Sequence, residues 1–345
     1  MATSKTTGLK LKISLLIFVL LILYLGYKIT IGSNIVISAD TYYFYVPEKS
    51  TPSAIADTLE ERGFLKSWLS FKIMADLQKL EEIKPGMYEI KNGWNNRKLI
   101  KHFNSFKPKP TTFITLPSLQ NRNNLINAVC KGTNIHPSDV WKLLNDKKFV
   151  KELGGFNKES VFGIFLPKNY RIYKNSSAEE LLKRLYQEYL LFWNHERLEQ
   201  ATDMGLTPIE IYVLSSIVYS ETKLKEEMPI IAGVYVNRIQ KNMRLESDPT
   251  LVYATKKFDT RRVLNKDKNI NSPYNTYKNK GLPPGPIYIV PSWVLDKVLE
   301  YDGHDYLYFC ANPDLAGGHV FAETYEEHKE NAQRYHEKLD EENIF

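Results

Sequence analysis

Residues 207–239 read TPIEIYVLSSIVYSETKLKEEMPIIAGVYVNRI, and this stretch decides the fold of the larger part of the chain. Thr207 and Glu210, with Pro208 between them, form a strong helix start signal, because threonine caps the first turn and proline fits within it. An apolar stripe then recurs at helical spacing, at Ile211, Leu214, Ile217 and Val218. The spacing predicts a helix that packs one face into a core.

Glu221 continues this apolar stripe. It lies seven residues after Leu214 and four after Ile217, so a helix places its carboxylate in line with them. Apolar surroundings disfavour the ionised form, so such a carboxylate is either paired or held protonated. One interpretation is a general acid. The other is a helix that simply ends here, with the side chain in water or against Lys223 or Lys225, and spacing alone leaves both open.

A second buried helix is predicted over residues 230–239. Ala232 and Gly233 allow another helix to approach closely, because neither carries a large side chain. Asn237 and Arg238 are long polar groups at the end of an otherwise apolar element. They are therefore either exposed or orient another group.

Three polar, turn-rich segments follow, at residues 243–250 (MRLESDPT), 272–277 (SPYNTY) and 281–286 (GLPPGP). The three prolines of the last segment make it stiff, and its two glycines permit close approach of backbone. Asn, Thr, Tyr, Asp and Arg beside aromatic rings suit a sugar-binding groove, although ordinary turn chemistry explains the same composition. Such a groove requires Glu221, Asn275 and Tyr277 to line one cleft.

The N-terminal region departs most from the composition of the rest. Residues 13–27 (ISLLIFVLLILYLGY) contain one strongly polar side chain, a serine. Lys12 and Lys28 can extend their charged ends toward a membrane surface, and isoleucines lengthen the apolar run. We predict a transmembrane anchor over residues 13–31, preceded by a cytoplasmic tail over residues 1–12.

A cleaved signal peptide is the main alternative, but the sequence after the apolar run, KITIGSN, lacks the small-x-small pattern of a cleavage site. A buried helix of a soluble protein is the other alternative. The lysines cluster before the span, which predicts a single pass with the N-terminus in the cytoplasm and everything after about residue 32 outside it.

The charge balance argues against a nucleic-acid partner. The 345 residues include 46 Lys and Arg against 40 Asp and Glu, a net charge of +6. Four of the six excess charges are the lysines of residues 1–28, so the rest of the chain carries only +2. A nucleic-acid-binding body is normally more basic. The composition, 43% hydrophobic and 25% charged, is that of a globular protein rather than a disordered or polytopic membrane chain.

Cysteine and histidine spacing predicts neither a metal site nor a cofactor. Cys130 and Cys310 lie 180 residues apart. This spacing allows a disulfide as one alternative, but two buried free thiols are favoured. His319, His328 and His336 are nine and eight residues apart rather than the three or four that zinc ligands often show.

Two folded regions follow the anchor. Residues 41–105 predict a small α+β module, with strands at 41–46 and about 84–90, helices from near 52, 67 and 96, and a Lys-Pro-Lys-Pro linker after it at 107–110. Residues 111–340 predict a larger domain, with a strand at 111–116, helices at 123–131 and 137–144, an extended segment at 163–173 and one long helix from 178 to about 200. The predicted fold class is therefore α+β, with a transmembrane helix at its N-terminus.

Five motifs stand in a fixed order, at residues 216–222 (SIVYSET), 231–238 (IAGVYVNR), 243–250 (MRLESDPT), 274–277 (YNTY) and 281–285 (GLPPG), followed by YLYF at 306–309 and GHVF at 318–321. In residue identity, order and spacing they resemble the motifs of the endolytic murein transglycosylases, the MltG or YceG-like family. The resemblance runs from the anchor to about residue 336 and is strongest from 210 to 325.

The resemblance implies a LysM-like fold for residues 41–105 and a mixed α+β transglycosylase catalytic domain over residues 111–340. It also implies a single-pass protein of the bacterial inner membrane with its catalytic domain on the periplasmic side. Peptidoglycan glycan strands are the implied substrate, and cell-wall synthases are candidate partners.

By the same resemblance Glu221 is the catalytic residue, because the second acidic position of the family's Ile-x-x-x-Glu-Thr motif falls on it. Many relatives carry Glu two residues earlier, where this chain has Tyr219, so Glu221 is the one acid of the motif here. Lys168 is a second departure, from a Pro-Asp-Thr that is usual in relatives. Substrate-binding residues are expected at Asn237, Arg244, Asp248, Thr250, Asn275, Thr276 and Tyr277.

The implied enzyme is a carbon–oxygen lyase acting on a polysaccharide, a glycan strand terminase. It would cleave the β-1,4 bond between N-acetylmuramic acid and N-acetylglucosamine in nascent strands and leave 1,6-anhydro ends. One carboxylate can serve as acid and then as base in such a lyase, whereas a hydrolase usually needs two. Two alternatives remain: a hydrolase that uses Glu221 with Asp248, and a non-catalytic, membrane-tethered peptidoglycan-binding or scaffold protein.

Overall fold

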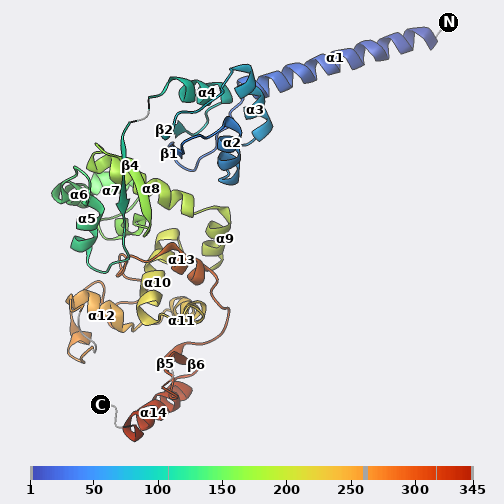
Figure 1. Ribbon diagram of the computed structural model, residues 1–345. Helices are drawn as coiled ribbons and strands as arrows, with labels where there is room; N and C mark the ends of the chain where they lie inside the picture. The colour runs from blue at the N-terminus through green and yellow to red at the C-terminus, as the bar shows by residue number, and fades with distance from the viewer. Residues whose placement is uncertain (1–2, 108, 259–262, 316, 343–345) are drawn as a thin grey trace. The chain divides into compact units, whose positions relative to one another are not determined.

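The computed structural model describes residues 3–107, 109–258, 263–315 and 317–342 of the chain. Its architecture is mixed α+β and mostly helical, and the strands of the described residues pair into three two-stranded sheets (Figure 1). Two compact units divide the chain. The first comprises Met1–Thr112 and Arg171–Lys174, and the second comprises Phe113–Tyr170 and Asn175–Phe345.

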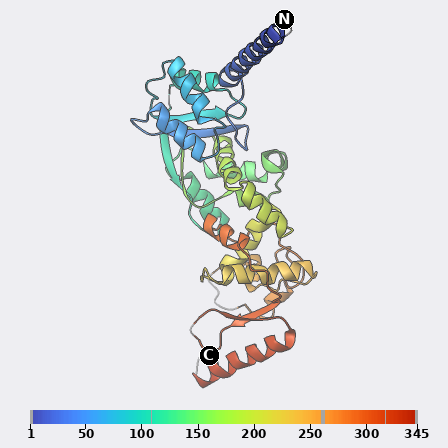
Figure 2. The same cartoon turned by 90° about the vertical axis from the view of Figure 1, so that its right-hand side faces the viewer.

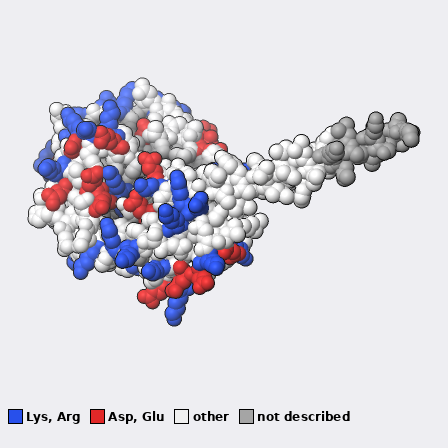
Figure 3. All heavy atoms as spheres, turned by 90° about the horizontal axis from the view of Figure 1, so that it is seen from above, with Lys and Arg blue, Asp and Glu red and all other residues white. Residues whose placement is uncertain are grey.

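The chain begins with the long helix α1 (Thr3–Thr30), so residues 1 and 2 of the predicted tail lie outside the described residues. Its segment Ile13–Thr30 is long and apolar enough to cross a membrane by length and composition, and none of it is buried. Figure 3 shows the described part of this helix almost free of charged side chains, whereas the rest of the visible face mixes both signs. Full exposure argues against a core helix of a soluble protein.

The first unit has the predicted order of strand, helices and strand. Its elements after α1 are β1 (Thr41–Val46), α2 (Pro52–Glu61), α3 (Trp68–Leu77), β2 (Gly86–Lys91) and α4 (Asn96–Ser105). β1 and β2 pair antiparallel, with Phe44 opposite Tyr88, and α3 packs against both α2 and α4. Side chains along β1 alternate between buried and half-buried, so one face of the strand lies in the core.

Two buried asparagines connect the helices of this unit. Asn34 Nδ2 donates to Asn96 Oδ1 at 2.7 Å and to the Ser67 carbonyl at 3.0 Å, and Asn34 Oδ1 accepts the Ser67 amide at 2.9 Å. Asn96 Nδ2 in turn donates to the Ile29 carbonyl at 3.2 Å and to Ser70 Oγ at 3.1 Å. The end of α1 and the starts of α3 and α4 therefore share one hydrogen-bond network.

The second sheet pairs β3 (Thr111–Thr115) with β4 (Asn169–Tyr173), and each of these strands contributes residues to both units. The remaining elements belong to the second unit. They are α5 (Arg122–Cys130), α6 (Pro137–Asn145), α7 (Lys147–Gly154), the 3-10 helix η1 (Ser160–Ile164), α8 (Ala178–Phe192), α9 (His195–Asp203), α10 (Pro208–Glu221), α11 (Met228–Gln240), α12 (Asp248–Thr255), the 3-10 helix η2 (Asp267–Asn269), α13 (Ser292–Leu299), β5 (Tyr308–Ala311), β6 (His319–Ala322) and α14 (Tyr325–Glu341). Helix α14 packs on the antiparallel β5–β6 pair (Figure 2).

Three sequence predictions differ from the structure here. The helix predicted from residue 178 to about 200 is two helices, because Asn194 caps a new one by accepting the Arg197 amide. The segment predicted to be extended from residue 163 begins inside η1. The turn-rich residues 243–250 lead into α12, which a proline in its first turn helps to start.

Helix α10 lies at the centre of the second unit. The predicted capping box of Thr207 and Glu210 is present, and Pro208 occupies the first turn. Residues 211–218 are all buried, because α10 contacts α11, α12, α13 and η1. The predicted apolar stripe is therefore part of a helix that is enclosed on every side over two turns.

Two glycines permit close approach of backbone. A side chain on Gly285 would collide with the Glu159 carbonyl, which confirms the close approach predicted for the 281–286 segment. A side chain on Gly233 would meet the Asp302 carbonyl oxygen at 2.5 Å. Gly233 itself therefore faces the loop around residue 302, whereas α11 packs against the helices α10 and α13.

The asparagine network predicts a large loss of stability for Asn34→Ala. The substitution leaves the buried Asn96 Oδ1 and the Ser67 amide without their partner, and each such loss costs about 1–3 kcal/mol. We expect the free energy of opening to fall by about 2–4 kcal/mol for the β1 and β2 amides, measured by hydrogen exchange on the full chain. The control is Asn104→Ala at an exposed position, which should change it by less than about 0.5 kcal/mol. Equal effects of the two substitutions would contradict the network.

Candidate active site

Glu221 is the last residue of α10, so the buried helix fixes its backbone while its side chain leaves the core. Its Oε1 accepts two hydrogen bonds, from the Tyr235 hydroxyl at 2.7 Å and from Ser247 Oγ at 2.5 Å. Tyr235 lies on α11 and Ser247 directly precedes α12. Two separate segments therefore hold one oxygen of a carboxylate that a third, α10, carries.

The second oxygen of Glu221 is open. Oε2 accepts no hydrogen bond from any of the described residues. A fully buried oxygen would then lack a partner, and Oε2 is not such an atom, so part of its surface contacts solvent. The Glu221 side chain as a whole is half-buried. One oxygen is thus fixed by the protein, and the other is available to a ligand.

Burial raises the pKa of Glu221 above its ordinary value. The hydrogen bonds from Ser247 and Tyr235 oppose this shift, because they stabilise the charged form, and the nearby charge of Asp248 adds to it. The balance is a raised pKa, so more of the carboxyl stays protonated at a given pH than in an exposed glutamate.

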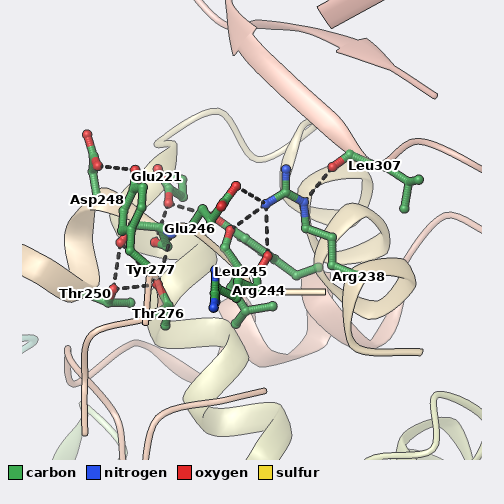
Figure 4. A network of polar contacts seen from close by, with 12 residues as sticks. Glu221, Arg238, Arg244, Leu245, Glu246, Asp248, Thr250, Thr276, Tyr277 and Leu307 are labelled. Atoms are coloured by element: carbon green, nitrogen blue, oxygen red, sulfur yellow. Dashed lines mark hydrogen bonds and ion pairs between the residues drawn. The ribbon is translucent and has the colours of Figure 1, made fainter. Parts of the chain in front are cut away.

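The backbone of Ser247 is itself held in place by two buried threonines. Thr276 Oγ1 accepts the Ser247 amide at 3.0 Å, and Thr250 Oγ1 donates to the Ser247 carbonyl at 2.6 Å. The two threonine hydroxyls also bond each other at 2.8 Å (Figure 4). Thr250 and Thr276 are fully buried, so they support the residue that supports Glu221 rather than face an open groove.

Asp248 and Tyr277 form a second polar pair beside Glu221 (Figure 4). The Tyr277 hydroxyl donates to Asp248 Oδ1 at 2.6 Å. Asp248 is exposed and Tyr277 is half-buried, so both present atoms to the surface. Burial raises the pKa of Tyr277, and its bond to the Asp248 carboxylate raises it further, so the phenol remains a donor.

Asn275 does not reach this surface. Its side chain is fully buried and donates to the carbonyls of Lys268 at 2.9 Å and Ile270 at 2.8 Å, while Oδ1 accepts the Tyr277 amide at 2.9 Å. Glu221, Asn275 and Tyr277 therefore do not all line one open cleft. Asn275 instead fixes the loop that presents Tyr277.

The polar end of α11 also orients neighbouring loops. Asn237 Nδ2 donates to the carbonyls of His304 at 2.7 Å and Tyr306 at 3.0 Å. Arg238 is buried and donates to the Leu307 carbonyl at 2.6 Å and the Leu245 carbonyl at 2.9 Å (Figure 4). Of the two interpretations of Asn237 and Arg238, orientation of other groups is the one realised.

Arg244 differs from the other expected binding residues. Its side chain is exposed, and its backbone carbonyl accepts a hydrogen bond from Arg238 at 3.1 Å. Arg244 therefore places an exposed cation in the segment that carries Ser247 and Asp248.

Glu227 connects α10 to the C-terminal strands. It accepts from Thr222 Oγ1 at 3.0 Å and from the His319 amide at 2.6 Å, and it pairs with His319 Nδ1 at 2.9 Å. Burial alone would raise the pKa of Glu227, but these hydrogen bonds lower it. Glu227 therefore stays ionised and differs in role from Glu221.

The two departures from the family pattern have structural partners. Tyr219 packs edge-on against Tyr288, with ring centroids 5.3 Å apart, and Lys223 lies 3.5 Å from the Tyr219 ring centroid. Lys168 forms an ion pair with Glu188. Lys223 thus covers an aromatic ring rather than pairing with Glu221.

Sequence reasoning did not single out Tyr235 or Ser247, the two partners of Glu221. Both lie inside motifs quoted for the family resemblance, but their distance to Glu221 depends on how three elements pack. Cys130 is a buried free thiol and Cys310 a half-buried one. Within the described residues, no three His, Cys, Asp or Glu side chains gather as a metal site would require.

The raised pKa of Glu221 predicts a pH-dependent cost in stability. Between the unfolded pKa of about 4.3 and the higher folded one, the native state binds more protons, so the free energy of unfolding falls as pH rises. Glutamine cannot titrate, so we expect the difference in thermal stability between Glu221→Gln and wild type to shift in favour of the variant as pH rises from about 4 to about 8. Thermal unfolding of the full chain in detergent across this range measures it. Glu226→Gln, at an exposed position, should show no such trend, and a relative loss for Glu221→Gln on raising pH would contradict the assignment.

Comparisons with known proteins agree with the motifs. The chain matches the YceG-like family over residues 44–334. It is 28% identical to the endolytic murein transglycosylase of Bacillus subtilis (strain 168), over 86% of each chain. It is 26% identical to the protein of that name from Streptococcus pneumoniae (strain ATCC BAA-255 / R6), over 95% of this chain but only 65% of the relative's length.

A solved structure is also similar. The crystal structure of a yceG-like protein from Listeria monocytogenes matches with a TM-score of 0.53 and 25% identity, over 84% of this chain and 98% of the other. Because the family match covers most of its length, this chain belongs to the YceG-like family.

Proposed function

We propose that this protein is a membrane-anchored, endolytic lytic transglycosylase of peptidoglycan in which Glu221 is the acid and then the base. Relatives at 26–28% identity over most of the chain carry the name endolytic murein transglycosylase. The observation that carries the proposal is the state of Glu221: one oxygen fixed by two hydroxyl groups, the other open, and a raised pKa. This is the arrangement that a proton donor at neutral pH needs.

The proposed reaction begins with proton transfer. Glu221 donates a proton from Oε2 to the oxygen that links N-acetylmuramic acid to N-acetylglucosamine. The bond from the muramyl C1 to that oxygen breaks, its electron pair stays on the oxygen, and positive charge develops at C1. The Glu221 carboxylate then takes the proton of the muramyl 6-hydroxyl as that oxygen bonds to C1. The product is a 1,6-anhydro end, and no water is consumed.

Tyr235 and Ser247 act between the two proton transfers. Their hydroxyls donate to Oε1, so they stabilise the carboxylate after it has lost its proton. They also prevent rotation of the carboxyl, which keeps Oε2 directed to the substrate. The pair therefore sets a pKa that is raised by burial but still allows the proton to leave.

Asp248 is the carboxylate that a hydrolase would need as its second group. Its Oδ1 accepts the Tyr277 hydroxyl at 2.6 Å, which gives it a binding and positioning role in the proposed reaction. We assign substrate contact to Asp248, Tyr277 and Arg244. The other expected binding residues, Asn237, Thr250, Asn275 and Thr276, hold the loops that carry these groups.

The domain roles and location follow from the same proposal. Residues 13–31 would anchor the chain in the bacterial inner membrane, with residues 1–12 in the cytoplasm. The LysM-like module at 41–105 and the catalytic domain at 111–340 would then lie on the periplasmic side, where nascent glycan strands and cell-wall synthases are found. The lysines before the apolar segment support this orientation.

Loss of the acid should abolish cleavage. We expect the full chain in detergent micelles to release glycan fragments from peptidoglycan, and Glu221→Gln to slow release about 10²–10⁴-fold, because glutamine cannot transfer the proton. Mass spectrometry of the products measures both rate and chemistry. Glu226→Gln is the matched control, since this exposed residue lies in the same segment, and it should cleave like wild type.

Product chemistry separates the alternatives. Anhydro-muramyl ends support the proposal, whereas reducing ends would indicate hydrolysis through Glu221 and Asp248. A wild-type protein that binds peptidoglycan and releases nothing would indicate a scaffold. Wild-type rates in Glu221→Gln would remove Glu221 from the reaction.

Removal of one hydrogen bond to Oε1 should move the pH profile. Ser247→Ala deletes a bond that lowers the pKa of Glu221, so this pKa should rise. The basic limb of kcat/KM, which reports loss of the acid's proton, should then shift to higher pH. Ser220→Ala on α10, where the hydroxyl bonds the Ser216 carbonyl, should leave the profile in place. A shift of the Ser247→Ala limb to lower pH would contradict this role.

A further inference from the structure

A cavity of about 470 Å³ lies in the second unit, apart from the Glu221 carboxylate. Its walls come from the start of α5, from α6, from the second half of α12 and from the segment before Tyr277. Six of its lining residues carry the argument: Gln120, Asn121, Asn123, Trp141, Tyr253 and Tyr274. Of these six residues Tyr274 alone belongs to one of the family motifs, and the proposed reaction gives the cavity no role.

One wall is polar but compensated in charge. Arg122 Nη1 pairs with Glu159 Oε2 at 2.6 Å, and the Tyr274 hydroxyl bonds both of them at 3.0 Å. The guanidinium also lies 4.0 Å from the ring centroid of Phe162. This half-buried guanidinium is paired with a carboxylate, so the pair offers little net charge to a ligand. Among the described lining residues the other cation is Lys256, which is exposed.

The remaining wall offers free amides and aromatic faces. Among the described residues the side-chain amides of Gln120 and Asn123 make no hydrogen bond, and Asn121 uses only its Oδ1, which caps α5. Trp141 is half-buried, and the ring centroids of Tyr253 and Tyr274 lie 4.7 Å apart. Amides that bond hydroxyl and acetamido groups, next to aromatic rings, suit an uncharged N-acetylated sugar.

The cavity shares its construction with the Glu221 site. Thr250 and Tyr253, three residues apart, lie on one face of α12. Thr250 bonds Thr276 in the Glu221 site, and Tyr253 packs on Tyr274 at the cavity wall. One face of α12 and the segment 274–276 therefore each contribute one residue to each of the two sites. Tyr253 lies five residues after Asp248 in α12, which is a rise of about 7.5 Å along the helix axis.

We propose that this cavity is a distal subsite that binds one N-acetylated hexosamine of the glycan strand while Glu221 acts on a bond farther along it. The inference rests on the proposed function and adds to it a second point of contact with substrate. Trp141 supplies the stacking face, and Gln120 and Asn123 supply the hydrogen bonds.

Binding is tested directly at Trp141. The chain has five tryptophans, so 5-fluorotryptophan gives five ¹⁹F resonances, and Trp141→Phe identifies the one from Trp141. In the full chain in detergent, triacetylchitotriose should shift this resonance in both wild type and Glu221→Gln. The acidic dipeptide alanyl-glutamate should leave the Trp141 resonance unmoved. An unmoved Trp141 resonance at millimolar sugar, or a shift with the dipeptide alone, overturns the subsite.

Steady-state kinetics of cleavage test whether the substrate uses the cavity. Trp141→Ala should raise KM for long glycan strands about tenfold, with a smaller effect on kcat, because substrate loses a contact distant from the reacting bond. Gln120→Ala, a loop variant that removes no internal hydrogen bond, should raise KM in the same direction and serves if Trp141→Ala does not fold. Tyr325→Ala, an exposed aromatic residue on α14, is the matched control and should leave KM unchanged.

The outcomes distinguish the two proposals. If wild type cleaves and both cavity variants keep its KM, the distal subsite is wrong and the proposed function stands. If wild type shifts the Trp141 resonance but cleaves nothing, the lytic function is wrong and the cavity remains a sugar-binding site.

Discussion

The candidate site depends on a carboxylate at the end of an enclosed helix. Helix α10 is buried over two full turns, so Glu221 cannot change position without disturbing the core around residues 211–218. Its side chain emerges where α11 and the start of α12 meet, and two hydroxyls fix one of its oxygens. Protonation of this carboxyl then reflects the packing of three elements rather than the local sequence alone.

A second layer of contacts preserves that geometry. Thr250 and Thr276 hold the backbone of Ser247, and Arg238 holds the carbonyls that precede it. These polar groups are buried and paired, so each is costly to remove. This explains why the region around Ser247 contains buried polar residues as well as exposed ones such as Arg244 and Asp248.

The sequence predicted the elements better than the contacts. Caps and apolar spacing located α10, and alternating aromatic residues located β1, because these signals are local. The break at Asn194 and the helical turns after Ser247 were missed, since a capping side chain and tertiary packing decide them. Asn275 was expected in a groove, but its polarity serves the loop's own carbonyls, and side-chain composition cannot distinguish these uses.

The two ends of α12 support different sites: Ser247, next to its start, holds Glu221, and Tyr253, near its end, lines the cavity. One continuous helix joins them, so its rise of about 1.5 Å per residue sets their separation along the helix axis. If a sugar occupies the cavity during cleavage, the helix acts as a ruler. The bond that is cut would then lie at a fixed offset along the strand from the held sugar.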